Sequence, residues 1–160
     1  MNTLHFDAIL HICRYLSNAD HIKFSMASRF YDRIKFGVTF DAEMYILDII
    51  KLPYFNRFSN VVVNNTDHSM PTCARHLTFS FRFNQKIDDY LPATVTHITF
   101  GYCFNQLIDN CIPKSITYLK FGRMFNQNLN TLHSSVEHIY LHKSYEQCID
   151  ERIQPKITYY

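Results

Sequence analysis

The chain has 160 residues, enough for one ordinary domain or for one short module joined to a second. Hydrophobic residues make up 47% and charged residues 19%, which excludes a wholly disordered chain. No apolar run reaches the roughly 18 residues of a membrane span. The net charge of +2 is too small to predict a nucleic-acid partner. Five cysteines without a C-x-x-C pair indicate reduced thiols in the cytoplasm or the nucleus.

Residues 1–52 are predicted to form a helical module. Two successive segments place apolar residues at steps of three and four, which gives each segment one apolar helix face. The first set is Phe6, Ile9, Leu10, Cys13 and Leu16, and the second is Ile22, Met26, Ala27 and Phe30.

A third helix is predicted from Asp41 to Pro53, with its apolar face formed by Met44, Leu47 and Ile50. The segment 53–75 that follows is transitional. Its three consecutive valines predict an irregular strand over 60–64 that would cover the N-terminal edge of the next region.

Four copies of one segment fill the rest of the chain, at 76–96, 97–117, 118–137 and 138–158. Each copy begins with polar and apolar residues in alternation, as around Leu77, which predicts a short half-buried strand. A period of 20–21 residues has room for one strand, a tight corner and a coiled return, but not for a strand and a long helix. We therefore predict a short parallel-β solenoid whose turns stabilise one another.

Identical residues recur after each strand. The tripeptide Phe-Asn-Gln begins at Phe83, Phe104 and Phe125 and becomes Tyr-Glu-Gln at Tyr145. In stacked turns its asparagines would lie about 4.7–4.9 Å apart and cap backbone groups as a structural ladder: Asn84, Asn105 and Asn126. A further apolar column in the core is expected to comprise Val95, Ile116, Val136 and Ile157.

The outward strand positions are the predicted target-binding surface, because stacked strands build one continuous face. Aromatic rings interleaved with cations suit a protein or peptide partner, and the alternative is an ordinary solvated surface. The positions are His76, Thr78, His97, Thr99, Tyr118, Lys120, His138 and Tyr140.

The histidines that share one column on this surface do not predict a metal site, because no cysteine pair joins them at zinc-finger spacing. We expect instead that His76 and His97 repel each other when both are protonated. Neither G-x-S-x-G nor H-E-x-x-H occurs, and no nucleophile has a base and an orienting acid at a supporting spacing. The sequence therefore predicts no catalytic residue, no metal and no cofactor.

The repeats resemble FNIP repeats, a short relative of leucine-rich repeats found in amoebae and in large viruses that infect them. The resemblance rests on the F-N-Q core, the strand pattern x-[LI]-x-F, and the later pairs Leu91-Pro92 and Ile112-Pro113. The third copy lacks this proline and one residue, and in the fourth Pro155 falls one position late. The resemblance implies a leucine-rich-repeat-like fold.

Residues 4–34 resemble an F-box, with Leu4 and Asp7 leading into a Leu-x-x-Ile-x-x-Tyr-Leu-like segment that ends at Leu16. The proline usual after the first leucine is His5 here. The resemblance implies that this module docks on the Skp adaptor of cullin–RING ubiquitin ligases; alternatively, the same side chains pack on the solenoid as a helical cap. The implied contacts are Leu4, Ile9, Leu10, Ile12, Tyr15, Leu16, Ile22, Phe24 and Phe30.

Together these patterns predict an α+β chain with a helical F-box-like module at 1–52 and a FNIP solenoid at 76–160. The resemblances imply a non-catalytic substrate-recognition adaptor of a cullin–RING ligase that binds an unknown target protein, without nucleic-acid or membrane partners. Its location would be the cytoplasm, that of the host for a viral protein, or the nucleus. The alternative is an interaction scaffold, or a decoy that delivers no target. Because the sequence stops at Tyr160, where a fifth strand would begin, we expect weak end-to-end self-association.

Overall fold

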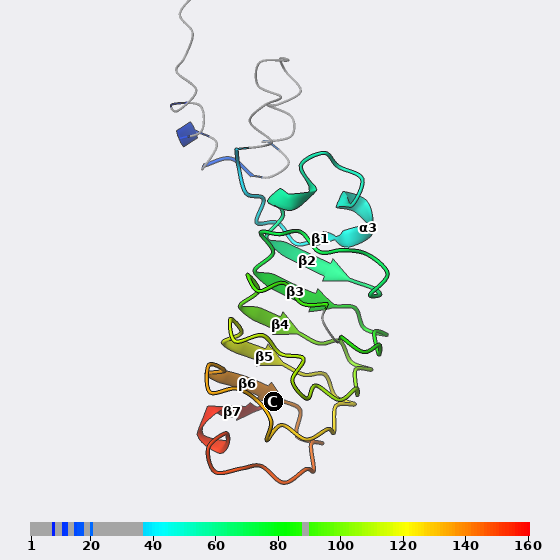
Figure 1. Ribbon diagram of the computed structural model, residues 1–160, viewed down its shortest axis with the longest axis vertical. Coiled ribbons are helices and arrows are strands. Elements are labelled where there is room, and N and C mark those ends of the chain that lie inside the picture. The colour runs from blue at the N-terminus through cyan, green and yellow to red at the C-terminus, as the bar shows by residue number, and fades with distance from the viewer. Residues whose placement is uncertain (1–7, 9–10, 13–14, 18–19, 21–36, 88–89) are drawn as a thin grey trace, which may run out of the picture.

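The computed structural model describes residues 8, 11–12, 15–17, 20, 37–87 and 90–160. In this part of the chain, seven short parallel strands pair in chain order and form one sheet (Figure 1). Irregular segments connect the strands, with short helical turns added between β1 and β2 and between β6 and β7. The strands are β1 (Met44–Tyr45), β2 (Asn60–Val63), β3 (His76–Phe79), β4 (His97–Thr99), β5 (Tyr118–Lys120), β6 (His138–Leu141) and β7 (Ile157–Tyr159).

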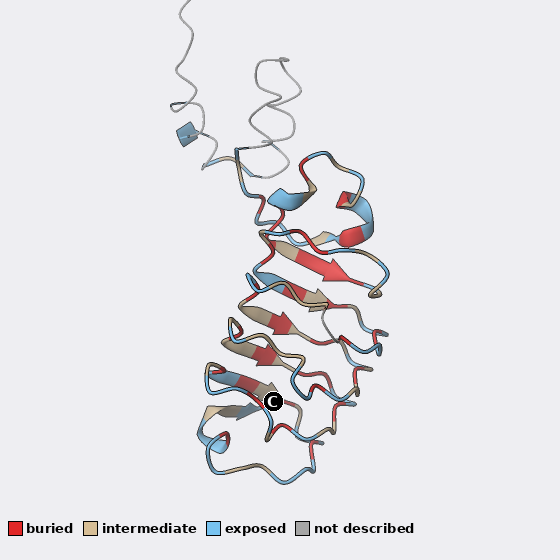
Figure 2. Cartoon of the chain, in the orientation of Figure 1, coloured by how far each residue is buried: buried red, intermediate tan, exposed pale blue. Residues whose placement is uncertain are grey.

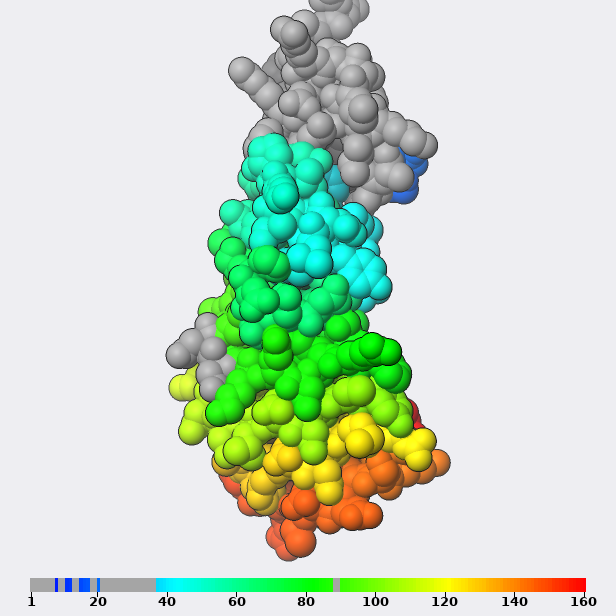
Figure 3. Space-filling view, turned by 90° about the vertical axis from the view of Figure 1, so that its right-hand side faces the viewer, coloured from blue at the N-terminus to red at the C-terminus, as the bar shows by residue number. Residues whose placement is uncertain are grey.

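Successive turns stack in one register. Leu77 pairs with Ile98, Ile98 with Leu119, and Leu119 with Ile139, so equivalent residues of neighbouring repeats lie side by side. In the space-filling view of Figure 3, the turns follow one another as bands along the long axis. The predicted parallel-β solenoid with leucine-rich-repeat-like turns is therefore confirmed.

Columns of aromatic rings fill the interior between the sheet and the returning segments. Phe79, Phe100 and Phe121 are stacked with ring centroids 5.1 and 5.0 Å apart. A second column runs through Phe83, Phe104, Phe125 and Tyr145 with centroid distances of 6.1, 6.0 and 6.1 Å. All of these side chains are buried. Figure 2 shows buried residues recurring along the strands of successive turns. Burying one such side chain contributes about 1.5–3 kcal/mol, so each turn gains its stability from the turns beside it.

The N-terminal end of the solenoid differs from the prediction. The helix expected from Asp41 to Pro53 is limited to α3 (Ile46–Ile49), because Met44 and Tyr45 form a strand that pairs with β2. The side chains of Ile46 and Ile49 are fully buried at this end of the core. The strand expected over 60–64 lies at Asn60–Val63, and it is paired on both sides, so it does not form the edge.

A backbone bridge between Phe40 and Phe58 extends this pairing further toward the N-terminus, and their rings stack at 5.0 Å. The sheet therefore begins well before residue 76, inside the segment predicted to belong to the helical module. The short helix η2 (Phe55–Arg57) lies between β1 and β2. None of the described helices is long and apolar enough to cross a membrane.

The last turn also differs from the prediction. Ile157 was expected in the column of Val95, Ile116 and Val136, but it lies in β7 and pairs with Ile139. Ile153 is the buried residue that precedes the final strand. The turn is short because η3 (Gln154–Lys156), which contains Pro155, leads directly into β7. The residues at which a fifth repeat strand would begin thus form β7, which pairs with β6 and is the last strand of the described sheet.

Candidate protein-interaction face

The sheet has one side that is turned away from the core. Along each strand, buried residues such as Ile98 alternate with residues that point outward. All eight residues of the predicted target-binding surface occupy outward positions, and we call them the outer face. His76 and His138 are exposed, and the others are half-buried: Thr78, Thr99, Lys120, Tyr140, His97 and Tyr118.

Four rings of the outer face form a continuous row across β3 to β6. The centroids of His76 and His97 lie 4.4 Å apart, and His97 stacks on Tyr118 at 5.2 Å. The ring of Tyr118 in turn contacts that of Tyr140, with centroids 5.1 Å apart. Tyr140 is the next outward residue after His138, which pairs with Tyr118, so the row shifts by two residues along β6. Rings supported on both sides lose little conformational freedom when a partner binds, and this makes them effective interface residues.

Lys120 is the cation at the centre of the outer face. Its Nζ lies 5.0 Å from the centroid of the Tyr160 ring, a cation–π contact. The Tyr160 hydroxyl donates a hydrogen bond of 2.7 Å to the carbonyl oxygen of Phe121, which holds this ring over the sheet. Among the described residues, Arg152 forms an ion pair with Asp150 on the last turn, and Lys120 has no carboxylate partner. Lys120 is therefore available to a partner's anionic group.

The row of rings also changes the ionisation of its members. Burial, together with the charges of His76 and His138, lowers the pKa of His97 from its ordinary value of 6.5. Burial, together with Tyr140, raises the pKa of Tyr118 above 10.0. Near neutral pH, His97 is therefore largely uncharged, and Tyr118 retains the hydroxyl proton that it can donate to a partner.

A second group of exposed apolar side chains lies at the corner that follows the strands. Phe81 and Tyr102 stack with centroids 4.9 Å apart, and Met124 of the next turn is half exposed. Sequence alternation would point Phe81 inward after Phe79. The chain turns at Phe81, however, and its side chain is 63% exposed. The strand pattern therefore does not predict this exposed ring.

The asparagines of the repeated tripeptide form a ladder at the same corner. The Oδ1 of Asn84 accepts a 2.8 Å hydrogen bond from the backbone N–H of Asn105, and the Oδ1 of Asn105 accepts one of 2.9 Å from Asn126. The last rung is the 3.0 Å bond from the Glu146 N–H to Asn126. Each amide thus satisfies a backbone donor of the next turn, which is a structural rather than a catalytic arrangement.

The residues predicted to bind an adaptor are described only in part. Ile12 and Tyr15 are 46% and 80% exposed, and Leu16 is half-buried. The other six lie outside the described residues: Leu4, Ile9, Leu10, Ile22, Phe24 and Phe30.

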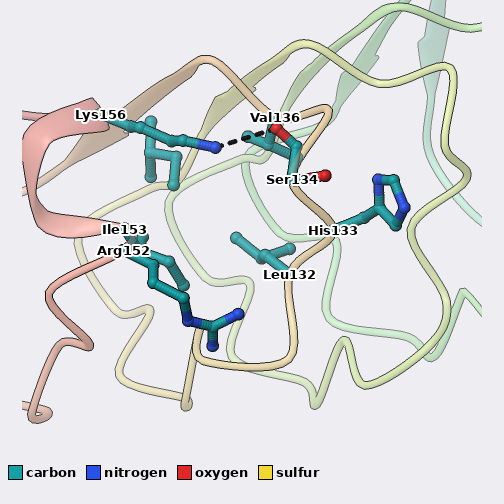
Figure 4. Close-up of a pocket in the computed structure, with 8 residues that line it drawn as sticks. Leu132, His133, Ser134, Val136, Arg152, Ile153 and Lys156 are labelled. Carbon is teal, nitrogen blue, oxygen red and sulfur yellow. Dashed lines mark hydrogen bonds between the residues drawn. The ribbon is translucent and has the colours of Figure 1, made fainter.

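The described residues contain no group of three or more His, Cys, Asp or Glu side chains that could hold a metal ion. A pocket of about 270 Å³ lies near the last turn, between apolar side chains such as Leu132 and Ile153 (Figure 4). At its rim the Nζ of Lys156 donates a 3.0 Å hydrogen bond to the carbonyl of Ser134, and Arg152 is paired with Asp150. These cations are occupied within the chain, which makes the outer face the better candidate for binding.

A parallel-β solenoid with an open strand face is an architecture typical of protein-interaction scaffolds. Comparison with known proteins agrees with the repeat-solenoid architecture. A model of the FNIP repeat family matches residues 68–103 and 104–132, so the chain contains FNIP repeats. Both matches fall within the solenoid, and neither includes residues 4–34.

Among solved structures, the chain resembles a crystal structure described as that of CroV588, a novel circular leucine-rich-repeat protein. The two are 32% identical, with a TM-score of 0.59, over 76% of this chain and 19% of that one. The chain therefore spans about a fifth of the length of that relative. No curated protein matches the sequence.

Proposed function

We propose that this chain is a non-catalytic interaction protein whose outer face binds a target protein. The FNIP repeats and the leucine-rich-repeat-like solenoid support a scaffold role. The observation that carries the proposal is the supported row of rings from His76 to Tyr140 beside Lys120, which makes no ion pair with a described residue. Large rings with polar edges, held in place before binding, are typical of residues that dominate interface energies.

The finer proposal is that the N-terminal module connects this target to a ubiquitin ligase. It is supported by the resemblance of residues 4–34 to an F-box and by the exposure of Ile12 and Tyr15, apolar side chains that can contact an adaptor. The chain would accelerate ubiquitin transfer without chemistry of its own. Binding both proteins raises the local concentration of a target lysine near the conjugating enzyme, to about the millimolar range for a short flexible connection.

Co-purification of the full chain with an Skp-type adaptor tests the ligase role. The wild-type chain should retain the adaptor, and Leu10→Asp together with Leu16→Asp should abolish retention. Loss of the adaptor from the wild-type chain would leave an interaction scaffold, the second class that the sequence allows. Retention of the adaptor without any ubiquitylated client would instead identify a decoy.

The target-binding role is tested separately by substitutions on the outer face. Replacing Tyr118 and Tyr140 together with alanine should remove bound client proteins from the purified full chain, because it breaks the row of rings. Leu107→Ala is the matched control, since it removes an exposed apolar side chain of a returning segment. Clients that are retained equally by all three proteins would place target binding elsewhere.

A further inference from the structure

The outward strand positions of the outer face carry no Asp or Glu side chain. Every outward position of β3 to β6 holds His, Thr, Tyr or Lys, and the outward positions of β2 and β7 are also without Asp and Glu. The nearest acidic residue in sequence is Glu137, which precedes β6 at the strand's beginning. The chain as a whole has 14 Asp and Glu residues, so their absence from this face reflects where they are placed.

Cations, by contrast, lie on the face and along its corner. Phe81 and Tyr102 occupy equivalent positions of the first two repeats. The third and fourth repeats carry Arg123 and Lys143 at the same position. Both side chains are exposed, and neither has an ion-pair partner among the described residues. With Lys120 they form a cationic strip along the C-terminal ends of β5 and β6.

The polar groups of the neighbouring rings would complete an anion-binding surface. The hydroxyls of Tyr118 and Tyr140 make no hydrogen bond to another described residue, and burial keeps Tyr118 protonated. Hydrogen bonds from a neutral donor to a carboxylate are stronger than those to a neutral acceptor. These hydroxyls and the ammonium of Lys120 would therefore bind acidic side chains better than amides of the same shape.

We propose that the outer face binds an acidic segment of the target protein, with the segment's carboxylates on the strip Lys120, Arg123 and Lys143 and its apolar side chains against the row of rings. This inference rests on the proposed function, and it specifies the chemistry of the target. Single-stranded nucleic acid also combines negative charge with stacking, but the overall charge of +2 gives little of the electrostatic attraction that a phosphate backbone requires.

Selection of a displayed library of random 12-residue peptides on the full chain tests the inference. Enriched peptides should contain two or more Asp or Glu residues next to an apolar residue. Synthetic copies of these peptides should bind Lys120→Glu and Arg123→Glu at least tenfold more weakly than wild type in fluorescence anisotropy. Lys114→Glu, the same charge change at an exposed position in the return between β4 and β5, should alter binding less than twofold. Circular dichroism melting would verify that each variant is folded, and Lys120→Gln provides a milder substitution at the central position.

The remaining outcomes separate this inference from the proposed function. Enriched peptides without acidic residues that lose binding when Tyr118 and Tyr140 become alanine would overturn the acidic preference and leave the outer face as the target site. Peptides that bind all variants equally, or no enrichment, would overturn both. A 12-nucleotide oligothymidylate that binds more tightly than every selected peptide would overturn the inference in favour of nucleic acid.

Discussion

The two faces of the sheet differ in how strictly their residues repeat from turn to turn, although the same strands build both faces. Inside, three turns repeat Phe79, Phe100 and Phe121 in one column, and each ring stacks on its equivalent. Outside, the equivalent positions change from His97 to Tyr118 along the same strand register. The interior must be uniform because each ring packs on the ring above it, whereas the outer face is free to vary. In this solenoid the repeated interior residues specify the fold, and the residues that vary between turns lie on the face that we propose binds a target.

The largest difference between the two sides should be seen when a ring is removed. Phe104 is fully buried between Phe83 and Phe125, so Phe104→Ala should lower the free energy of unfolding by about 3–5 kcal/mol. Tyr118→Ala on the outer face should cost about 1 kcal/mol or less, because this ring stays partly solvated. Urea unfolding followed by circular dichroism measures both, and similar losses would show that the outer rings are part of the core.

A smaller effect is expected where the turns approach each other most closely. A Cβ on Gly101 would overlap the backbone carbonyl of Ser80 in the preceding turn, so Gly101→Ala should cost about 1–3 kcal/mol through a backbone shift. Ser80→Ala is the matched control, because the equivalent residue one turn earlier already carries a Cβ. Thermal unfolding of the two variants should therefore differ, and equal melting temperatures would argue against this close approach.

The asparagine ladder gives a test based on hydrogen bonding. Asn105→Ala removes the acceptor for the Asn126 N–H and for the Nε2 of Gln127, and it should cost about 1–3 kcal/mol. Asn105→Asp keeps an oxygen acceptor at this position and should retain most of the stability. Urea unfolding of both variants at pH 7 measures the difference, and an aspartate as damaging as alanine would contradict the ladder.

The smallest predicted effect is a pH dependence from the outer face. The ring of His97 packs between those of His76 and Tyr118, and its Nδ1 shares a 2.8 Å hydrogen bond with the hydroxyl of Thr96. Burial and the charges of His76 and His138 lower the pKa of His97. At mildly acidic pH, the His97 side chain therefore binds protons more readily in the unfolded chain than in the folded chain. The packing of neutral His97 therefore contributes its full stability above pH 6.5, the ordinary histidine pKa. This contribution is lost as the pH falls from 6.5 through the lower pKa of His97 in the folded chain.

Urea unfolding at pH 7.5 and pH 5.5 measures this effect. The wild-type chain should lose more stability between these two conditions than His97→Gln does. His68→Gln, which replaces a histidine of the loop between β2 and β3, serves as the control. An unchanged pH dependence in His97→Gln would show that the column of histidines does not titrate as described.

Much of the solenoid could be predicted from the sequence because its repeat length and its strand alternation are both explicit. The period aligns Leu77, Ile98 and Leu119, and the structure pairs these residues. The outward positions follow from the same alternation, so the candidate face could be predicted with them. Its ring-to-ring contacts could not, because they depend on side-chain orientations that a strand pattern does not specify.

The ends of the array could not be predicted in the same way, since no repeat signal marks them. Helical spacing of Met44, Leu47 and Ile50 suggested a long helix, but pairing of Met44 with Val61 overrides it. At the other end, Ile157 is similar in type to the residues of two different columns. The shortened last turn decides between them by placing it beside Ile139.

The most direct test of the central claim is an NMR measurement of contacts between residues one repeat apart. In a chain with isotope-labelled phenylalanine and histidine, nuclear Overhauser effects should link the rings of Phe79, Phe100 and Phe121 in sequence, with equivalent contacts from His76 to His97 on the other side of the sheet. Contacts confined to residues within one repeat, with none between successive repeats, would contradict the stacked solenoid and the outer face that depends on it.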